Sequence, residues 1–239
     1  PPPPPPPPPP GLFPADYGIR DIVLSLVGSE MCIRDRVHGL WFGAAFMAPM
    51  ARRLEQMTGL PVRRINYRST RGELGEHADR LFEFAQQSDA TKRHLVGHSL
   101  GGLVILKMLS REPEFAPGRV VFLGSPIHGS GAARKMQRIP GASSLLGKIR
   151  TDLEKGFEGS FAGREAGMIA GTRPVGLGLF VGGLDGPGDG TVALEETRAE
   201  WLREHYELDL THTGLIYSRT AAEKTAVFIE TGSFGQAAA

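Results

Sequence analysis

The stretch HLVGHSLGGLVILKML, residues 94–109, decides the fold. Its first residues favour a strand, its last residues favour an apolar helix, and the turn between them has the pattern Gly-x-Ser-x-Gly. A serine hydroxyl is a weak nucleophile unless it is presented sharply beside a base. Gly97 and Gly101 fit this role, because a Cβ at either position would collide with the neighbouring strand or helix. We therefore predict a strand-to-helix elbow with Ser99 at its apex.

Strand-like and helical segments alternate along the rest of the chain. Residues 119–123, RVVFL, form the clearest buried strand because they are short and continuously apolar. Further β-prone segments lie at 62–67 and 91–96, with weaker candidates at 168–170 and 206–210, and helical patterns cover 46–57, 74–87, 103–109 and 220–229. This alternation predicts an α/β fold with a mostly parallel central sheet and helices on both faces.

Composition excludes several classes of protein. The 239 residues include 27 Lys and Arg against 26 Asp and Glu, and this balance argues against a nucleic-acid-binding surface or a polybasic membrane anchor. No apolar run reaches the roughly 18 residues that a spanning helix needs, so we expect no transmembrane segment. The single cysteine, Cys32, excludes an intramolecular disulfide and a cysteine-based metal cluster.

The first 36 residues do not resemble a natural domain. Residues 1–10 are all proline and would form a polyproline II rod without a core. Residues 26–35, LVGSEMCIRD, resemble the translation of a synthetic sequencing adapter. We interpret residues 1–36 as an assembly artefact joined to one domain that spans residues 37–239. The native beginning is then hidden, and the sequence assigns no compartment beyond a slight preference for the cytoplasm. A native proline tract would instead be a ligand for a proline-binding domain.

The elbow is accompanied by motifs that occur together in one superfamily. They are VHGLW at 37–41, LGSP at 123–126 with HGS at 128–130, DGTV at 189–192 and THTG at 211–214. With these motifs, residues 37–234 resemble the α/β-hydrolase superfamily, specifically small bacterial lipase-like or esterase-like serine hydrolases. The resemblance implies an α/β-hydrolase fold that hydrolyses carboxylic esters through an acyl-enzyme, without a metal or organic cofactor.

The resemblance also implies a class of partner. We expect a small-molecule or lipid ester as the substrate, no nucleic acid, and an oligomeric state that the sequence does not reveal. An acyltransferase with the same catalytic residues is one alternative. A non-catalytic binding protein on the same fold is the other.

Two further residues complete the expected triad. His212 lies in a Thr-His-Thr-Gly loop after a strand candidate, where the superfamily places its base, and it would take the Ser99 proton. His128 is the rival base. The resemblance favours Asp189 as the acid that holds the imidazole in one tautomer, and Asp185 is the rival acid.

The tetrahedral intermediate needs two preorganised N–H donors. One is expected from Leu100, the residue after the nucleophile. The resemblance implies Leu40, which follows the His-Gly pair, as the other. His38 and His128 are candidates to shape the pocket, and Trp41 either lines the acyl pocket or belongs to the core.

The resemblance is weakest in the strand that should precede His38. This strand is expected to be a buried apolar run, but residues 33–37 read IRDRV. Three successive charges in a central strand are expensive to bury. We therefore expect the first core strand to be damaged by the artefact, and the chain as written to fold poorly.

Residues 141–163 show weak periodicity and scattered glycine and serine. We interpret them as a helical insertion over the site, in which Phe157, Phe161 and the pair Leu145-Leu146 form an apolar cover. The alternative is that these side chains belong to the core of a plain helix.

Overall fold

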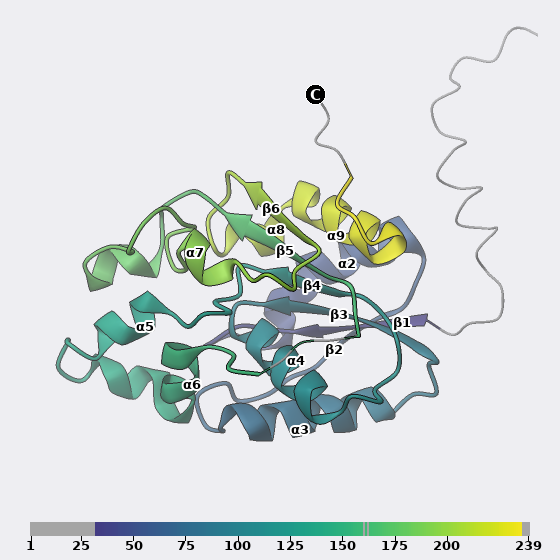
Figure 1. Ribbon diagram of the computed structural model, residues 1–239, viewed down its shortest axis with the longest axis horizontal. Coiled ribbons are helices and arrows are strands. Elements are labelled where there is room, and N and C mark those ends of the chain that lie inside the picture. The colour runs from purple at the N-terminus through teal and green to yellow at the C-terminus, as the bar shows by residue number, and fades with distance from the viewer. Residues whose placement is uncertain (1–31, 160, 162, 236–239) are drawn as a thin grey trace, which may run out of the picture. The chain divides into compact units, whose positions relative to one another are not determined.

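Six parallel strands form the central sheet of the computed structural model, which describes residues 32–159, 161 and 163–235 (Figure 1). The strand order is β2-β1-β3-β4-β5-β6, and every neighbouring pair is parallel. The strands are β1 Cys32–Val37, β2 Val62–Arg64, β3 Lys92–His98, β4 Val120–Leu123, β5 Ala166–Gly171 and β6 Glu204–Leu208. The predicted α/β fold is confirmed. Residues 1–31 of the segment that we interpret as an artefact lie outside the described residues.

Helices cover both faces of this sheet (Figure 1). On one face α3, Leu74–Gln86, packs against α4, Leu100–Arg111, and on the other α2, Ala48–Thr58, packs against α9, Arg219–Thr231. The shorter helices are η1 Ala44–Met47, α5 Gly131–Met136, η2 Ala142–Ile149, α6 Arg150–Lys155, η3 Leu177–Val181, α7 Leu194–Thr197 and α8 Gly214–Tyr217. None of the helices in the described ranges is long and apolar enough to cross a membrane.

Consecutive residues of the central strands face opposite cores, as the two-residue period of a strand requires. Leu95 and Phe122 belong to the apolar cluster shared with α3 and α4. Val96 and Leu123 belong to the cluster shared with α2 and α9. Because both faces are covered, the loops at the carboxyl ends of the strands are where a parallel sheet of this kind places a site.

Strand β1 lies between β2 and β3 although its sequence contains three successive charges. The Asp35 carboxylate is fully buried, 3.7 Å from Nε of Arg63 on β2 and 3.6 Å from Nη1 of Arg93 on β3. Burial raises the pKa of Asp35, and the two guanidinium groups oppose this shift. Arg36 is also buried and donates from Nη1 to the carbonyl oxygen of Met47. The strand that we expected to be damaged is thus formed, since cations from both neighbouring strands offset the burial of its carboxylate.

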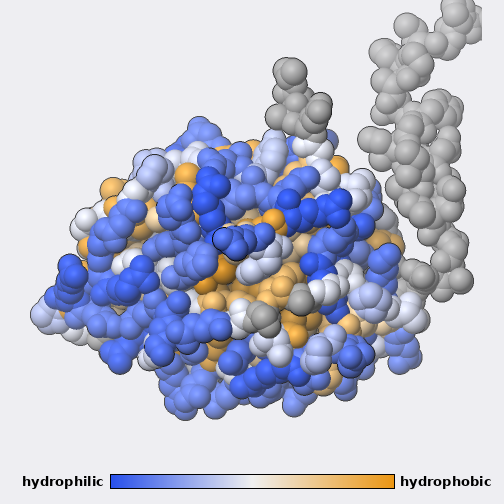
Figure 2. All heavy atoms as spheres, in the orientation of Figure 1, coloured by the Kyte–Doolittle hydropathy of each residue, from blue (hydrophilic) through white to orange (hydrophobic). Residues whose placement is uncertain are grey.

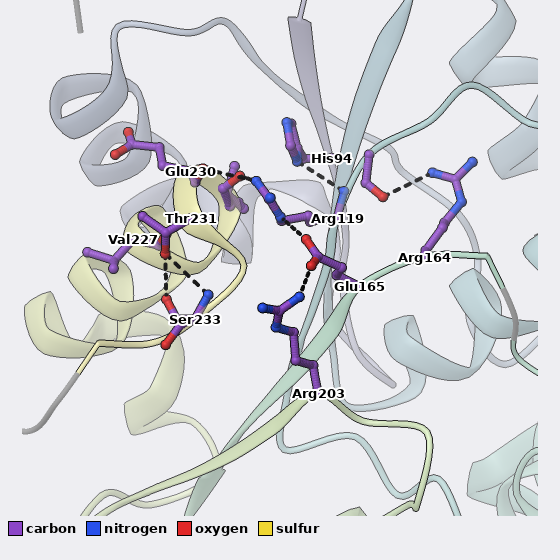
Figure 3. Close-up of polar contacts among 11 residues, drawn as sticks. His94, Arg119, Arg164, Glu165, Arg203, Val227, Glu230, Thr231 and Ser233 are labelled. Carbon is purple, nitrogen blue, oxygen red and sulfur yellow. Dashed lines mark hydrogen bonds and ion pairs between the residues drawn. The ribbon is translucent and has the colours of Figure 1, made fainter. Parts of the chain in front are cut away.

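A polar cluster holds the end of α9 against the amino-terminal side of the sheet (Figure 3). Arg119, which precedes β4, donates from Nε to Oε2 of Glu165 at 2.6 Å. It also donates from Nη1 to the carbonyl oxygens of Ile229 and Glu230, at 2.8 and 3.0 Å. Glu165 pairs in addition with Arg203, which precedes β6. The last carbonyls of a helix have no intrahelical partner, so Arg119 satisfies two of them and links α9 to the sheet.

The molecular face shown in Figure 2 is mostly hydrophilic, with one apolar area near the centre of the view. The described residues expose seven large apolar side chains: Trp41, Ile139, Leu145, Val175, Leu179, Tyr217 and Val227. Two of them, Trp41 and Val175, belong to the wall of one cavity. That cavity lies at the carboxyl side of the sheet.

Candidate active site

Ser99 occupies the turn between β3 and α4 in a strained backbone conformation. Its φ and ψ are 53° and −124°, which is rare for a residue with a side chain. The neighbouring strand β4 holds this conformation, because the Ser99 amide donates to the carbonyl oxygen of Leu123 at 3.0 Å. Backbone strain of this kind concentrates at functional sites, where it presents a side chain in a fixed direction.

The elbow glycines leave no room for a side chain. A Cβ on Gly97 would lie 2.7 Å from the Gly102 amide nitrogen, and a Cβ on Gly101 would lie 2.2 Å from the Val37 carbonyl oxygen. Both neighbours are backbone atoms, which cannot make room by a change of rotamer. The turn therefore brings Ser99 as close to β1 and α4 as the backbone allows, for the steric reason expected from the sequence.

His212 and Asp189 lie together at the carboxyl ends of the strands. Nδ1 of His212 is 2.6 Å from Oδ2 of Asp189, and the His212 amide donates to the Asp189 carbonyl oxygen at 2.9 Å. The second carboxylate oxygen accepts from the amides of Thr191 and Val192, at 2.9 and 2.8 Å. The carboxylate, which only accepts, fixes the proton on Nδ1 and leaves Nε2 of His212 as a proton acceptor.

The two rival residues do not join this pair. Asp185 has a side chain that is 71% exposed and pairs with Lys135 at 2.6 Å, and the Lys135 ammonium lowers its pKa. His128 is exposed and lines a separate depression together with His205. His128 is therefore not part of the cavity wall that we expected it to shape.

One cavity of about 190 Å³ contains both Ser99 and His212 in its wall. Its other lining residues are mostly apolar: Leu40, Trp41, Phe42, His98, Pro126, Ser130, Ala133, Met136, Leu146, Leu153, Val175, Gly176, Leu177, Thr191, Val192 and Thr213. None of these described lining residues is Asp, Glu, Lys or Arg. Within the described residues the Ser99 hydroxyl makes no hydrogen bond to the His212 imidazole, although both side chains belong to the cavity wall. The arrangement suits an uncharged ligand with an apolar portion.

The two residues expected to supply the oxyanion donors lie in segments next to Ser99. Leu100 is the first residue of α4, and its amide therefore has no acceptor within the helix. Leu40 belongs to the cavity wall. The loop before it approaches the elbow closely, since a Cβ on Gly39 would lie 3.1 Å from Cβ of Ser99. Both amides thus belong to segments that adjoin Ser99.

His38 belongs to the same loop, but its side chain does not line the cavity. Its ring is buried and stacked on Tyr67, with ring centroids 4.1 Å apart. The Tyr67 hydroxyl donates to the His38 carbonyl oxygen at 2.5 Å, and the Tyr67 amide donates to Nε2 of His38 at 3.3 Å. Burial lowers the pKa of His38. Sequence reasoning did not find Tyr67, because its partner lies 29 residues away in the chain.

Trp41 connects the loop that contains Leu40 with residues 141–163. It has a positive φ of 63° and is 44% exposed, so it lines the mouth of the cavity and is not plain core. Its amide donates to Oγ of Ser69 at 3.0 Å, and its indole Nε1 donates to the Leu145 carbonyl oxygen at 2.8 Å. Leu146 and Leu153 bring the insertion into the cavity wall. Leu145 itself is exposed.

Comparison with known proteins agrees with this architecture. The family described as the alpha/beta hydrolase family matches residues 37–225. The mature lipase BlEst2 of Bacillus licheniformis is similar in structure, with a TM-score of 0.69 and 21% identity over 86% of this chain and 94% of the lipase. The metagenomic carboxyl esterase MGS0156 has a TM-score of 0.64 and 16% identity over 86% of this chain and 77% of the esterase.

A third similar structure is the carboxylesterase CesB of Bacillus subtilis, with a TM-score of 0.55 and 12% identity over 86% of each chain. No curated protein matches the sequence. At these identities the solved structures show the fold alone. The family match covers most of the chain and includes the elbow, the loop of Asp189 and the loop of His212. The chain belongs to the alpha/beta hydrolase family.

Proposed function

We propose that the protein is a serine hydrolase that cleaves carboxylic esters through an acyl-enzyme, with Ser99 as nucleophile, His212 as base and Asp189 as acid. The observation that carries the proposal is the 2.6 Å bond from buried Asp189 to His212, because His212 and the strained Ser99 both belong to the wall of one cavity. Membership of the alpha/beta hydrolase family supports it. The similarity to a lipase and to carboxylesterases supports an ester as the substrate.

In the first half-reaction, Oγ of Ser99 attacks the ester carbonyl carbon while Nε2 of His212 takes the hydroxyl proton. A hydrogen bond between nucleophile and base is often long in the free enzyme and tightens with substrate, so its absence here is compatible with this step. The amides of Leu40 and Leu100 would stabilise the oxyanion. The intermediate collapses to acyl-Ser99, and His212 gives its proton to the departing alcohol.

In the second half-reaction, a water molecule replaces the alcohol. His212 takes a proton from this water, which attacks the acyl carbon and forms a second tetrahedral intermediate. Collapse of that intermediate releases the carboxylic acid and returns the proton to Ser99. Asp189 holds the imidazole in the required tautomer throughout and balances the charge of the transient imidazolium.

The cavity favours an uncharged ester with apolar acyl or alcohol groups. Its lining includes four Leu, two Val, Met136, Trp41 and Phe42, and no Lys, Arg, Asp or Glu stands among the described lining residues. An ionised substrate would be desolvated there without a partner, which is costly. Lipid or acyl esters therefore fit better than charged esters.

The test is labelling with a fluorophosphonate, which reacts with an activated serine whatever the natural substrate is. We expect the label on Ser99 by mass spectrometry, and loss of p-nitrophenyl ester hydrolysis by about four to six orders of magnitude in Ser99→Ala. Ser130→Ala is the matched control, because Ser130 lines the same cavity. Near-full hydrolysis by Ser99→Ala, with its melting temperature unchanged, would overturn the proposal.

A further inference from the structure

His98 lies directly before the nucleophile, and the mechanism above does not use its side chain. The side chain is completely buried and borders the same cavity as Ser99. Its ring lies beside the ring of His212, with centroids 4.6 Å apart and planes inclined by 46°. Nε2 of His98 is 3.1 Å from the main-chain carbonyl oxygen of His212. Two histidines that are 114 residues apart in the chain are thus in direct contact.

This contact defines the protonation state of His98. A carbonyl oxygen only accepts hydrogen bonds, so Nε2 of His98 must carry a proton and donate it. Nδ1 has no hydrogen-bond partner within the described residues and faces Gly39, where a Cβ would lie only 3.0 Å away. A proton on Nδ1 would therefore be buried without an acceptor. The ring is best accommodated as the neutral Nε2–H tautomer.

The electrostatic surroundings favour the same neutral form. Burial lowers the pKa of His98 well below its usual value, and the neighbouring His212 and His38 rings lower it further. A neutral ring at this position adds no second positive charge beside the base. The neutral ring still donates from Nε2 to the His212 carbonyl oxygen.

The bond completes the support of the His212 main chain. The His212 amide donates to the Asp189 carbonyl oxygen, and the His212 carbonyl oxygen accepts from His98. The first bond fixes the base relative to the acid, whereas the second fixes it relative to the turn that contains Ser99. No other hydrogen bond in the described part of the chain joins residue 98, 99 or 100 to His212. This contact is therefore the direct hydrogen bond between the elbow and the loop of His212 within the described residues.

We propose that His98 is a positioning residue that sets the place of His212 relative to Ser99 through its hydrogen bond to the His212 carbonyl oxygen. The proposal rests on the proposed Ser-His-Asp function. A displacement of about 1 Å in a catalytic group can cost about 100-fold in rate. Loss of the bond is therefore expected to slow the chemical step without removing any group that touches the substrate carbonyl.

The test compares two variants with side chains of similar length. His98→Gln keeps an N–H donor near the position of Nε2, whereas His98→Met has the same reach and no donor. We expect kcat of His98→Met for a p-nitrophenyl ester to fall about 10- to 100-fold, with a much smaller change in KM. The rate of fluorophosphonate labelling should fall in parallel, while His98→Gln should recover most of both rates.

A spectroscopic measurement on the unmodified protein keeps the test independent of folding. Nitrogen NMR of ¹⁵N-histidine-labelled protein should show a neutral Nε2–H tautomer for His98, assigned by comparison with His98→Gln. An Nδ1–H tautomer at neutral pH would overturn the proposal, because Nε2 could then not donate to the His212 carbonyl oxygen. Equal kcat values in His98→Met, His98→Gln and the parent would also overturn it. Failure of the triad itself would appear differently, as activity that survives Ser99→Ala.

Discussion

The Asp189 carboxylate meets the His212 imidazole in a place that solvent barely reaches: their side chains are 1% and 7% exposed, and the bond between them is 2.6 Å long. The amides of Thr191 and Val192 donate to the other carboxylate oxygen and fix the orientation of the Asp189 side chain. A dry environment strengthens this interaction relative to the same pair in water. Asp189 therefore controls which nitrogen of His212 is free.

Asp189→Asn should preserve the geometry of the site and remove most of its catalytic activity. An amide in place of the carboxylate can donate to Nδ1 and stabilise the wrong tautomer of His212. We expect kcat to fall by about three to four orders of magnitude, as in other triads, with little change in melting temperature. Asp185→Asn is the matched control, because Asp185 is exposed and pairs with Lys135 instead. Comparable losses in both variants would contradict the assignment of the acid.

Met136→Ala should extend the acyl chains that the cavity accepts. Met136 is a buried residue of α5 and part of the cavity wall, so its truncation adds apolar space. Burial of one additional methylene contributes about 0.8 kcal/mol, which corresponds to roughly fourfold in kcat/KM per methylene. A series of p-nitrophenyl esters of increasing length should show the optimum moving to longer chains. Ile139→Ala, at a more exposed position outside the cavity, should leave the profile where it is.

The buried histidines predict that stability falls in weak acid. Burial lowers the pKa values of His38 and His98 below their usual 6.5, and His77 and His205 shift in the same direction. Below pH 6.5 these histidines bind protons in the unfolded chain, whereas in the folded protein they stay neutral until the pH approaches their lowered pKa values. Stability is therefore complete above pH 6.5 and is lost as the pH falls toward the folded-state pKa values. Each histidine contributes at most about 1.4 kcal/mol per pH unit.

Urea titrations between pH 6.5 and about 5 measure this effect. Asp35 and Glu196 have raised pKa values, chiefly through burial, and act in the opposite direction. The informative quantity is therefore the difference in slope between the parent and His98→Gln, which removes one titrating ring. Identical slopes would show that His98 titrates alike in the folded and unfolded states.

Arg119→Ala should destabilise the fold without touching the cavity. Its guanidinium bonds to Glu165 and to two carbonyls at the end of α9, and it is only partly exposed. Hydrogen bonds to charged groups contribute about 1.5–3 kcal/mol, so we expect a loss of that size in the free energy of unfolding. Arg173→Ala, which breaks an exposed pair with Asp209, should cost much less, because solvent screens exposed ion pairs. Equal losses would mean that the contacts of Arg119 with α9 are unimportant.

Most of the layered fold could be predicted because local patterns and tertiary structure agree. The helical pattern at 74–87 coincides with α3, Leu74–Gln86, and the apolar run at 119–123 contains β4, Val120–Leu123. Strand β1 is the exception. Its charged residues argue against a central strand, and the arginines that accompany Asp35 come from two other strands. Such compensation depends on pairing that a single segment does not reveal.

The candidate site could likewise be predicted only in part. Ser99, Asp189 and His212 lie in short loops whose sequences are distinctive, and the structure brings these loops to one cavity. The contacts of Tyr67 with His38, and of His98 with His212, join residues that have no motif in common. The sequence therefore indicates the residues that we propose for the chemistry, whereas the residues that contact them become visible only once the chain is folded.

The indole of Trp41 has a practical consequence. It stands at the cavity mouth, half in solvent and bonded to the insertion, and the chain contains only one other tryptophan, Trp201, which packs against Phe161 and Phe122. With Trp201 replaced by phenylalanine, tryptophan emission comes from Trp41 at the entrance alone. Occupancy of the chamber can then be followed in real time by intrinsic fluorescence, with no dye attached.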